Sequence, residues 1–270
     1  MEILGYLASL IIGISLGLIG GGGSILTVPV LVYLMGVEPV LATSYSLFIV
    51  GSTSLVGAIP KYRQGLVNLK TAIIFGAPSI LTVFATRKYI IPLIPNEVFT
   101  LSGFLVTKSI LMMVLFAILM VFASISMIRT QKKPEENENG EQKFNYPLIL
   151  LEGAIVGLLT GLVGAGGGFL IIPALVLLSK LPMKQAIGTS LLIIAAKSLI
   201  GFTGDLSHTK MDWKLLLIVT ALAIIGIFIG DKLSKKIDGD SLKKGFGWFV
   251  LVMGIYIIVQ QLFFPLGGGH

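Results

Sequence analysis

The sequence predicts an all-α polytopic membrane protein with two inverted-topology repeats of about five hydrophobic segments each, and with short glycine-interrupted helices near the midplane. Three observations lead to this fold class. Apolar residues make up 55% of the 270-residue chain and charged residues only 12%, whereas soluble domains carry about 25% charged residues. The apolar residues form long segments separated by polar loops. The later segments repeat the pattern of the earlier ones.

Each apolar segment is interpreted as a helix. We expect these helices at residues 3–19, 24–35, 40–60, 69–91 and 104–128, and then at residues 147–164, 168–179, 184–204, 213–233 and 245–264. A helix needs about 20 residues to cross the hydrocarbon layer, and most of these segments are long enough. Residues 24–35 and 168–179 are too short, and the sequence leaves open whether they span the membrane or re-enter it.

An internal duplication relates the two sets of segments. GLIGGGGSILTVPVL at residues 17–31 falls on GLVGAGGGFLIIPAL at residues 161–175, an offset of 161 − 17 = 144 residues. The same offset also matches Ala42 with Ala186, Ser46 with Ser190, Ser54 with Ser198, Gly57 with Gly201 and Lys70 with Lys214. Apolar sequences align leucine with leucine by chance, but they do not align glycine, proline and serine at one offset.

The duplication divides the chain into four parts. We expect a first membrane repeat at residues 1–128, a charged linker at 129–146, a second membrane repeat at 147–266 and the remnant of an expression tag at 267–270. The linker carries charges of both signs and little apolar area, so it is expected to be solvated. No secretory signal is expected at the N-terminus, and the first segment is interpreted as a retained helix.

The odd number of segments in each repeat inverts the second repeat relative to the first. Most loop lysines and arginines then lie on the side of the linker, as the positive-inside rule requires. We therefore expect the linker 129–146 in the cytoplasm and both termini outside. Arg87 and Lys88 end the fourth segment and are expected to mark the membrane boundary, while Asn68 and Asp212 are expected to cap the fourth helix of each repeat.

Composition also excludes several classes of function. The chain has no cysteine, so thiol catalysis and iron–sulfur clusters are excluded. It has only two histidines, so a histidine-rich metal site is not expected. We expect no cofactor, no metal site and no catalytic residue, and the chain is not interpreted as an enzyme. The net charge of +7 lies in short loop clusters, which favours contact with the lipid bilayer and not with nucleic acid.

The two glycine runs are the first candidate for a substrate site. Glycine permits a helix to break at membrane depth, and the N-terminus of the helix that follows attracts anions. Close helix packing is the alternative role, which spacings such as Gly13 and Gly17 would serve. The candidate substrate-binding positions in these runs are Gly20, Gly21, Gly22, Gly23 and Ser24, and Gly164, Gly166, Gly167 and Gly168.

The third segment of each repeat supplies the second candidate group. Ser44, Ser46, Thr189 and Ser190 carry hydroxyls that can bind oxyanion oxygens, although such hydroxyls commonly bond to a helix backbone instead. Lys197 lies in the middle of its segment, where a charge indicates a functional site by default. The alternative for Lys197 is a long stem that reaches the membrane interface.

These motifs together resemble the TauE/SafE family, the sulfite exporter or toluenesulfonate uptake permease-like transporters. The resemblance rests on GGGGSILTVP and GAGGGFLIIP, on ATSYS and AIGTS, and on NLK and DWK at the fourth segments. It implies a secondary transporter in the bacterial or archaeal cytoplasmic membrane. The implied substrate is sulfite, sulfoacetate or another organosulfonate, and the expected direction is export by alternating access.

Two departures and two alternatives accompany this resemblance. The first repeat has ATSYS where AIGTS carries the more usual Gly-Thr-Ser, and the second has Lys197 within its segment, so the substrate is not fixed. An anion channel and a non-transporting membrane scaffold are the alternative functions. A coupling ion, H⁺ or Na⁺, is a further expected partner, and the sequence does not set the oligomeric state.

Overall fold

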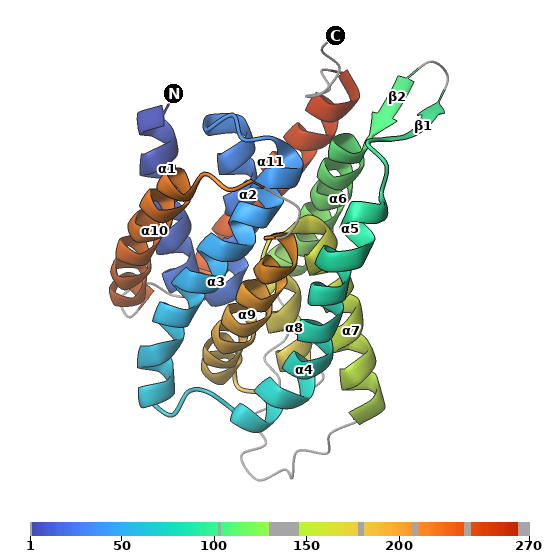
Figure 1. Cartoon of the computed structure of the whole chain (residues 1–270). Coiled ribbons are helices and arrows are strands. Elements are labelled where there is room, and N and C mark those ends of the chain that lie inside the picture. The colour runs from blue at the N-terminus through green and yellow to red at the C-terminus, as the bar shows by residue number, and fades with distance from the viewer. Residues whose placement is uncertain are drawn as a thin grey trace.

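The computed structural model describes residues 2–101, 104–129, 146–177, 181–206, 210–234 and 239–263. Six helices in these ranges are long and apolar enough to cross a membrane. Two further apolar helices, Pro147–Val163 and Gly247–Gln261, are shorter. The predicted class, an all-α polytopic membrane protein, is therefore confirmed, and Figure 1 shows the helices side by side.

The first half begins with a helix that changes type several times. Its elements are α1 (Glu2–Ile19), the 3₁₀ helix η1 (Gly20–Leu26), α2 (Thr27–Pro29) and the π-helix η2 (Val30–Leu34), followed by α3 (Pro39–Arg63), α4 (Leu69–Ala85), the π-helix η3 (Thr86–Ile90), α5 (Ile91–Leu93), β1 (Glu97–Leu101), β2 (Phe104–Thr107) and α6 (Lys108–Ile128). The second half is simpler. It consists of α7 (Tyr146–Val163), α8 (Gly168–Leu177), α9 (Met183–Asp205), α10 (Trp213–Ser234) and α11 (Gly239–Phe263).

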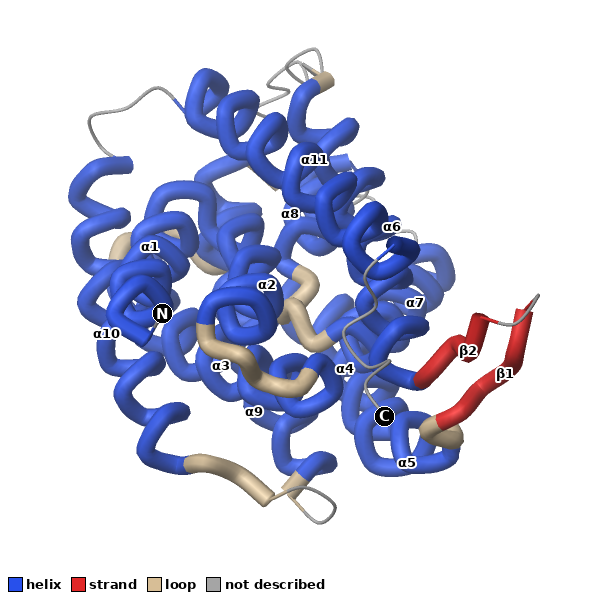
Figure 2. The backbone as a smooth tube through the Cα atoms, turned by 90° about the horizontal axis from the view of Figure 1, so that it is seen from above, coloured by secondary structure: helices blue, strands red, loops and turns tan. Residues whose placement is uncertain are grey.

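A β-hairpin interrupts the predicted fifth segment. Residues 104–107 form β2, which pairs antiparallel with β1 through Glu97 with Thr107 and Leu101 with Phe104. The prediction that a helix starts at residue 104 is therefore wrong: residues 104–107 form a strand, and the helix begins at Lys108. Phenylalanine, valine and threonine favour extended backbone. Figure 2 shows the hairpin projecting from the bundle beside α5.

Polar side chains set where several helices begin. Asn68 accepts a hydrogen bond from the Thr71 backbone N–H at 3.0 Å, and Asp212 accepts one from the Leu215 N–H at 3.1 Å. Both predicted caps of the fourth helices are therefore confirmed. Each cap satisfies an amide that has no partner within its helix.

Helices of one half pack mainly against the other half. The main pairs are α1 with α10, α4 with α7, α3 with α9, and α6 with α11. In the duplication α1 corresponds to α7 and α4 to α10, so the pair of α1 with α10 is equivalent to the pair of α7 with α4. The other two pairs each join a helix to its own counterpart. In Figure 1, α1 begins at the top while α7 begins at the bottom. The duplicated sequence thus has a duplicated set of contacts.

Glycines allow the close approach in the first two pairs. A Cβ on Gly13 of α1 would collide with the Ala223 carbonyl oxygen of α10, and a Cβ on Gly157 of α7 would lie 2.5 Å from the Ser79 carbonyl oxygen of α4. The two contacts are equivalent, because 157 − 13 and 223 − 79 both equal the 144-residue offset. The packing role, which the sequence offered as the alternative for glycines such as Gly13, is confirmed at that residue.

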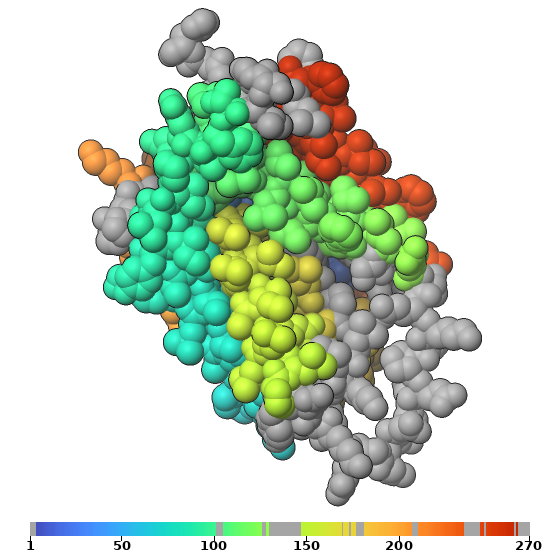
Figure 3. Space-filling view, turned by 90° about the vertical axis from the view of Figure 1, so that its right-hand side faces the viewer, coloured from blue at the N-terminus to red at the C-terminus, as the bar shows by residue number. Residues whose placement is uncertain are grey.

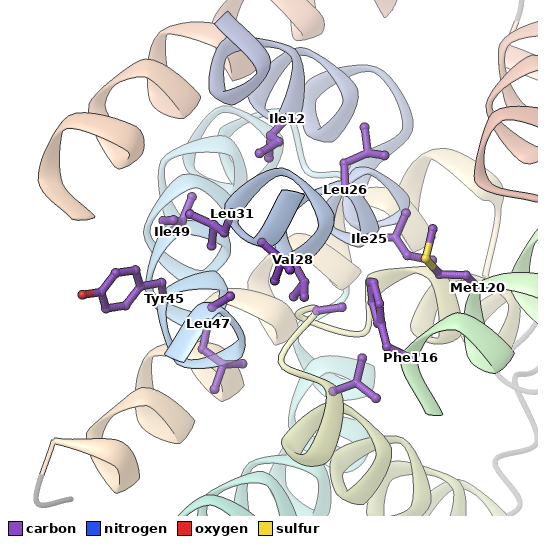
Figure 4. Close-up of a cluster of buried hydrophobic side chains, with 14 of the residues drawn as sticks. Ile12, Ile25, Leu26, Val28, Leu31, Tyr45, Leu47, Ile49, Phe116 and Met120 are labelled. Carbon is purple, nitrogen blue, oxygen red and sulfur yellow. The ribbon is translucent and has the colours of Figure 1, made fainter. Parts of the chain in front are cut away.

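The core lies around the short helical elements α2 and η2, which follow the first glycine run. Val28 and Leu31 are fully buried there against Ile12 of α1, Leu47 of α3 and Phe116 of α6, and Figure 4 shows Val28 central among them. Large apolar side chains also cover the outer surface, as lipid-facing helices require. Figure 3 shows one face of the protein, which is formed by α4, α7, α6 and α11.

Candidate functional site

The two glycine runs meet inside the protein. A Cβ on Gly21 would lie 2.6 Å from the Gly168 Cα atom, and a Cβ on Gly168 would collide with the Gly21 carbonyl oxygen. Both residues are buried. No side chain larger than hydrogen fits between these two backbones, so glycine is required at the crossing.

The helix break takes a different form in each run. Gly20 has φ +69°, and the chain then continues as the 3₁₀ helix η1. In the second run α7 ends at Val163, Gly164, Gly166 and Gly167 all have positive φ, and α8 starts afresh at Gly168. The predicted new helix N-terminus is thus present at α8. In the first run the backbone stays helical, so no separate helix starts there.

Lys197 points into the region of the second run. Its side chain is fully buried, and its Nζ donates a hydrogen bond to Thr160 Oγ1 at 3.0 Å. A Cβ placed on Gly167 would lie 2.7 Å from this ammonium group. The ion pairs found among the described residues do not include Lys197. The alternative of a stem reaching the interface does not describe this side chain.

A buried ammonium group without a carboxylate is costly, because desolvation is not offset by a nearby negative charge. Thr160 supplies only a neutral oxygen to Lys197, and the Thr160 hydroxyl itself donates to the Val156 carbonyl oxygen at 2.6 Å. The interior beside Gly167 therefore carries a positive charge that a bound anion would stabilise. Sequence reasoning identified Lys197 but not its partner Thr160.

The predicted hydroxyls divide into two groups. Thr189 of α9 accepts a hydrogen bond from the backbone N–H of Asn68, the residue that caps α4, at 2.9 Å. Ser190 donates to Ile187 O within α9 at 2.8 Å, so both hydroxyls are used by the fold. Ser24 likewise donates to Gly21 O at 2.8 Å. The Ser46 hydroxyl is buried and makes no hydrogen bond with any described residue.

The remaining predicted serine, Ser44, belongs to a polar cluster that the sequence did not reveal. Arg87, at the start of η3, has no exposed surface. Its Nη1 atom donates to Asp205 Oδ2 at 3.1 Å, to Thr43 Oγ1 at 3.0 Å and to Ser44 Oγ at 3.4 Å. Arg87 is thus buried between α3 and α9, whereas its neighbour Lys88 is exposed. That these two residues mark the membrane boundary stays a prediction.

A second ion pair joins the halves at the opposite end of α3. Lys61 Nζ lies 2.6 Å from Asp231 Oδ1, with side-chain exposures of 15% and 21%, against 0% and 5% for Arg87 and Asp205. Thr43 and Lys61 are 61 − 43 = 18 residues apart in α3, which is about 27 Å at 1.5 Å per residue.

The two ion pairs occupy equivalent positions with their charges exchanged. The 144-residue offset places Lys61 on Asp205 and Arg87 on Asp231. In one pair the cation belongs to the third segment, and in the other it belongs to the fourth. Opposite charges at matched positions of a duplication were the sequence signal that could have revealed both pairs.

This equivalence predicts that the Lys61–Asp231 pair tolerates reversal. Lys61→Asp alone places two carboxylates together and should lower the free energy of unfolding by about 1 kcal/mol, the scale of a partly exposed pair. Adding Asp231→Lys should restore most of that loss, because the fold accepts the reversed order at its other end. Thermal melting in detergent measures both variants, and a double variant no more stable than the single one would contradict the prediction.

Helices of membrane-spanning length around a buried crossing and two buried cations define a polytopic membrane protein with a polar interior, the general form of a transporter. The family described as "Sulfite exporter TauE/SafE" matches residues 5–257. The chain belongs to this family of membrane transporters, as the sequence motifs predicted.

Curated relatives match over nearly their whole length. A "Probable membrane transporter protein" of Xylella fastidiosa (strain 9a5c) is 30% identical over 92% of this chain and 91% of its own. YdhB of Bacillus subtilis is 25% identical over 93% of this chain and 98% of its own, and MJ0441 of Methanocaldococcus jannaschii is 26% identical over 92% of both. Both are described as probable membrane transporter proteins. No solved structure matches the chain significantly.

Proposed function

We propose that this membrane transporter is a secondary transporter that exports a small sulfur-containing anion, such as sulfite, sulfoacetate or another organosulfonate. One observation carries the proposal: the Lys197 ammonium is fully buried against Gly167, beside the crossing of the two glycine runs. A cation without a carboxylate partner, inside a membrane protein, favours an anionic substrate. The family's description as sulfite exporters supports the sulfur oxyanion in particular.

The chemistry of binding follows from three kinds of group. Lys197 offers a charged donor. In α8, a helix of ten residues, the backbone N–H groups of Leu170 and Ile171 donate to the Gly167 carbonyl oxygen, and those of Gly168 and Phe169, at the helix start, are the donors proposed for the anion. The positive end of the α8 dipole adds to the attraction. The Ser46 hydroxyl, which is buried and makes no hydrogen bond with any described residue, is a neutral donor on α3 between Thr43 and Val50, the two residues that contact the second run. Together these groups replace water around an oxyanion.

Alternating access is the proposed mode of movement, with residues 1–128 and 147–266 as the inverted repeats and the linker in the cytoplasm. The ion pairs Lys61–Asp231 and Arg87–Asp205 then close the cytoplasmic and outer ends of the path. The lower exposure of Arg87 and Asp205 supports a conformation that is sealed more tightly on the outside. An exporter in this state loads substrate from the cytoplasm.

A flux assay in proteoliposomes tests the function. Purified protein should move sulfite or sulfoacetate with saturable kinetics, and the flux should respond to a gradient of H⁺ or of Na⁺ if that ion is coupled. Vesicles without protein and chloride as the test anion are the controls. Large, unsaturating conductance would indicate a channel instead, and folded protein with no flux of any sulfur oxyanion would overturn the proposal.

A further inference from the structure

Arg87 has hydrogen-bond donors that the protein leaves unused. Its Nη1 atom serves Asp205, Thr43 and Ser44. Its Nε and Nη2 atoms are equally buried, yet they make no hydrogen bond with any described residue. A buried donor left without an acceptor costs about 1–3 kcal/mol, and more when the group is charged. Stability alone does not explain an arginine in this position.

The two unused nitrogens lie on the same edge of the guanidinium plane. Nε and Nη2 direct their N–H bonds in parallel from this edge, which matches two oxygens of one carboxylate, phosphate or sulfonate group. Asp205 occupies only the opposite corner of the plane, through Nη1. Arg87 can therefore hold Asp205 and an oxyanion at the same time.

The Arg87 cluster adjoins the glycine crossing. A Cβ on Gly164, the first glycine with positive φ in the second run, would collide with Thr43, the residue that accepts from Arg87. Further along the same run, Gly166 packs on Val50 of α3. Thr43 and Val50 are 50 − 43 = 7 residues apart, which is about 10 Å along a helix. The second run thus connects the surroundings of Arg87 with those of Lys197.

The Lys61–Asp231 ion pair, at the other end of α3, has no buried donor that is left unused. Lys61 presents a single ammonium group to Asp231 at 2.6 Å, and the pair is partly exposed, so its other protons can reach water. Positions 87 and 231 are equivalent in the duplication, but only the outer end carries a planar, fully buried cation with a free edge. The two ends therefore differ in what they can bind.

We propose that Arg87 forms a second oxyanion subsite, in which Nε and Nη2 bind the sulfonate or sulfite group while Nη1 stays on Asp205. This subsite lies on the outer side of the Lys197 site and takes the anion as it leaves. The inference rests on the proposed function, since it assumes a sulfur oxyanion as substrate.

The test compares charge-conserving variants of the full-length protein. Binding of sulfite and of sulfoacetate is measured by calorimetry, with wild type, Arg87→Lys and the exposed control Arg63→Lys. Lysine keeps the charge but has no flat edge, so Arg87→Lys should bind about tenfold more weakly. Arg63→Lys should bind like wild type. Melting curves without ligand show whether Arg87→Lys has kept its fold.

Asp205→Asn gives a second readout that a purely structural role would not produce. Asparagine keeps the shape and one acceptor oxygen of the side chain but removes the negative charge, so an anion at Arg87 should bind several-fold more tightly. Wild-type binding with no weakening in Arg87→Lys, or with no tightening in Asp205→Asn, overturns the subsite alone. Wild-type protein that binds neither probe overturns the proposed function, and the subsite with it.

Discussion

Replacing Lys197 with methionine is expected to remove most of the substrate binding and flux. Methionine has a similar length and suits a buried site, so the fold should survive, whereas the charged donor beside Gly167 is lost. A hydrogen bond to a charged group contributes about 1.5–3 kcal/mol, which corresponds to about 10- to 100-fold weaker binding. Calorimetry with sulfite or sulfoacetate and flux in proteoliposomes measure the effect.

A matched control separates loss of the site from loss of a positive charge in general. Lys210→Met removes an exposed lysine and should leave binding and flux unchanged. The melting temperature of Lys197→Met should stay at or above that of wild type, because an uncompensated buried charge is replaced by an apolar group of similar size. Unchanged transport in Lys197→Met would remove this residue from the mechanism.

Introducing a methyl group at Gly168 is expected to have the largest structural effect. The new Cβ would overlap the Gly21 carbonyl group and Cα atom, and both are backbone atoms that cannot rotate away. Overpacking of this kind costs about 1–3 kcal/mol, and occasionally more. Gly168→Ala should therefore lower the melting temperature in detergent and should also reduce flux, because α8 must move away from η1.

Gly76→Ala is the matched control for this clash. Gly76 is also buried in a helix, but a Cβ there would have its nearest neighbour, Ile193 Cγ1, at 3.8 Å, an ordinary contact. Alanine also favours the helix over glycine by about 1 kcal/mol, so Gly76→Ala should be as stable as wild type or more stable. Equal melting temperatures for Gly168→Ala and wild type would show that the two runs do not touch as described.

The site was predictable where its chemistry could be read from one segment. Lys197 stood out as a charge within an apolar stretch, and the glycine runs stood out because they occur twice. Arg87 and Asp205 did not stand out, because each ends an apolar segment, where charged residues are expected in any membrane protein. Their pairing depends on α4 and α9 lying side by side, and periodicity within a segment carries no information about that.

The amino-acid sequence by itself determined the class of protein, the number and limits of most segments, and the duplication, because burial in lipid imposes length and apolarity on every spanning helix. Only the tertiary structure decided that Gly21 meets Gly168, that Lys197 turns inward to Thr160, and that two ion pairs of reversed charge join the halves at opposite ends of α3. The physical reason is that lipid accepts apolar side chains all around a helix. Which face meets another helix is therefore settled by close packing and by the pairing of a few polar groups between distant segments.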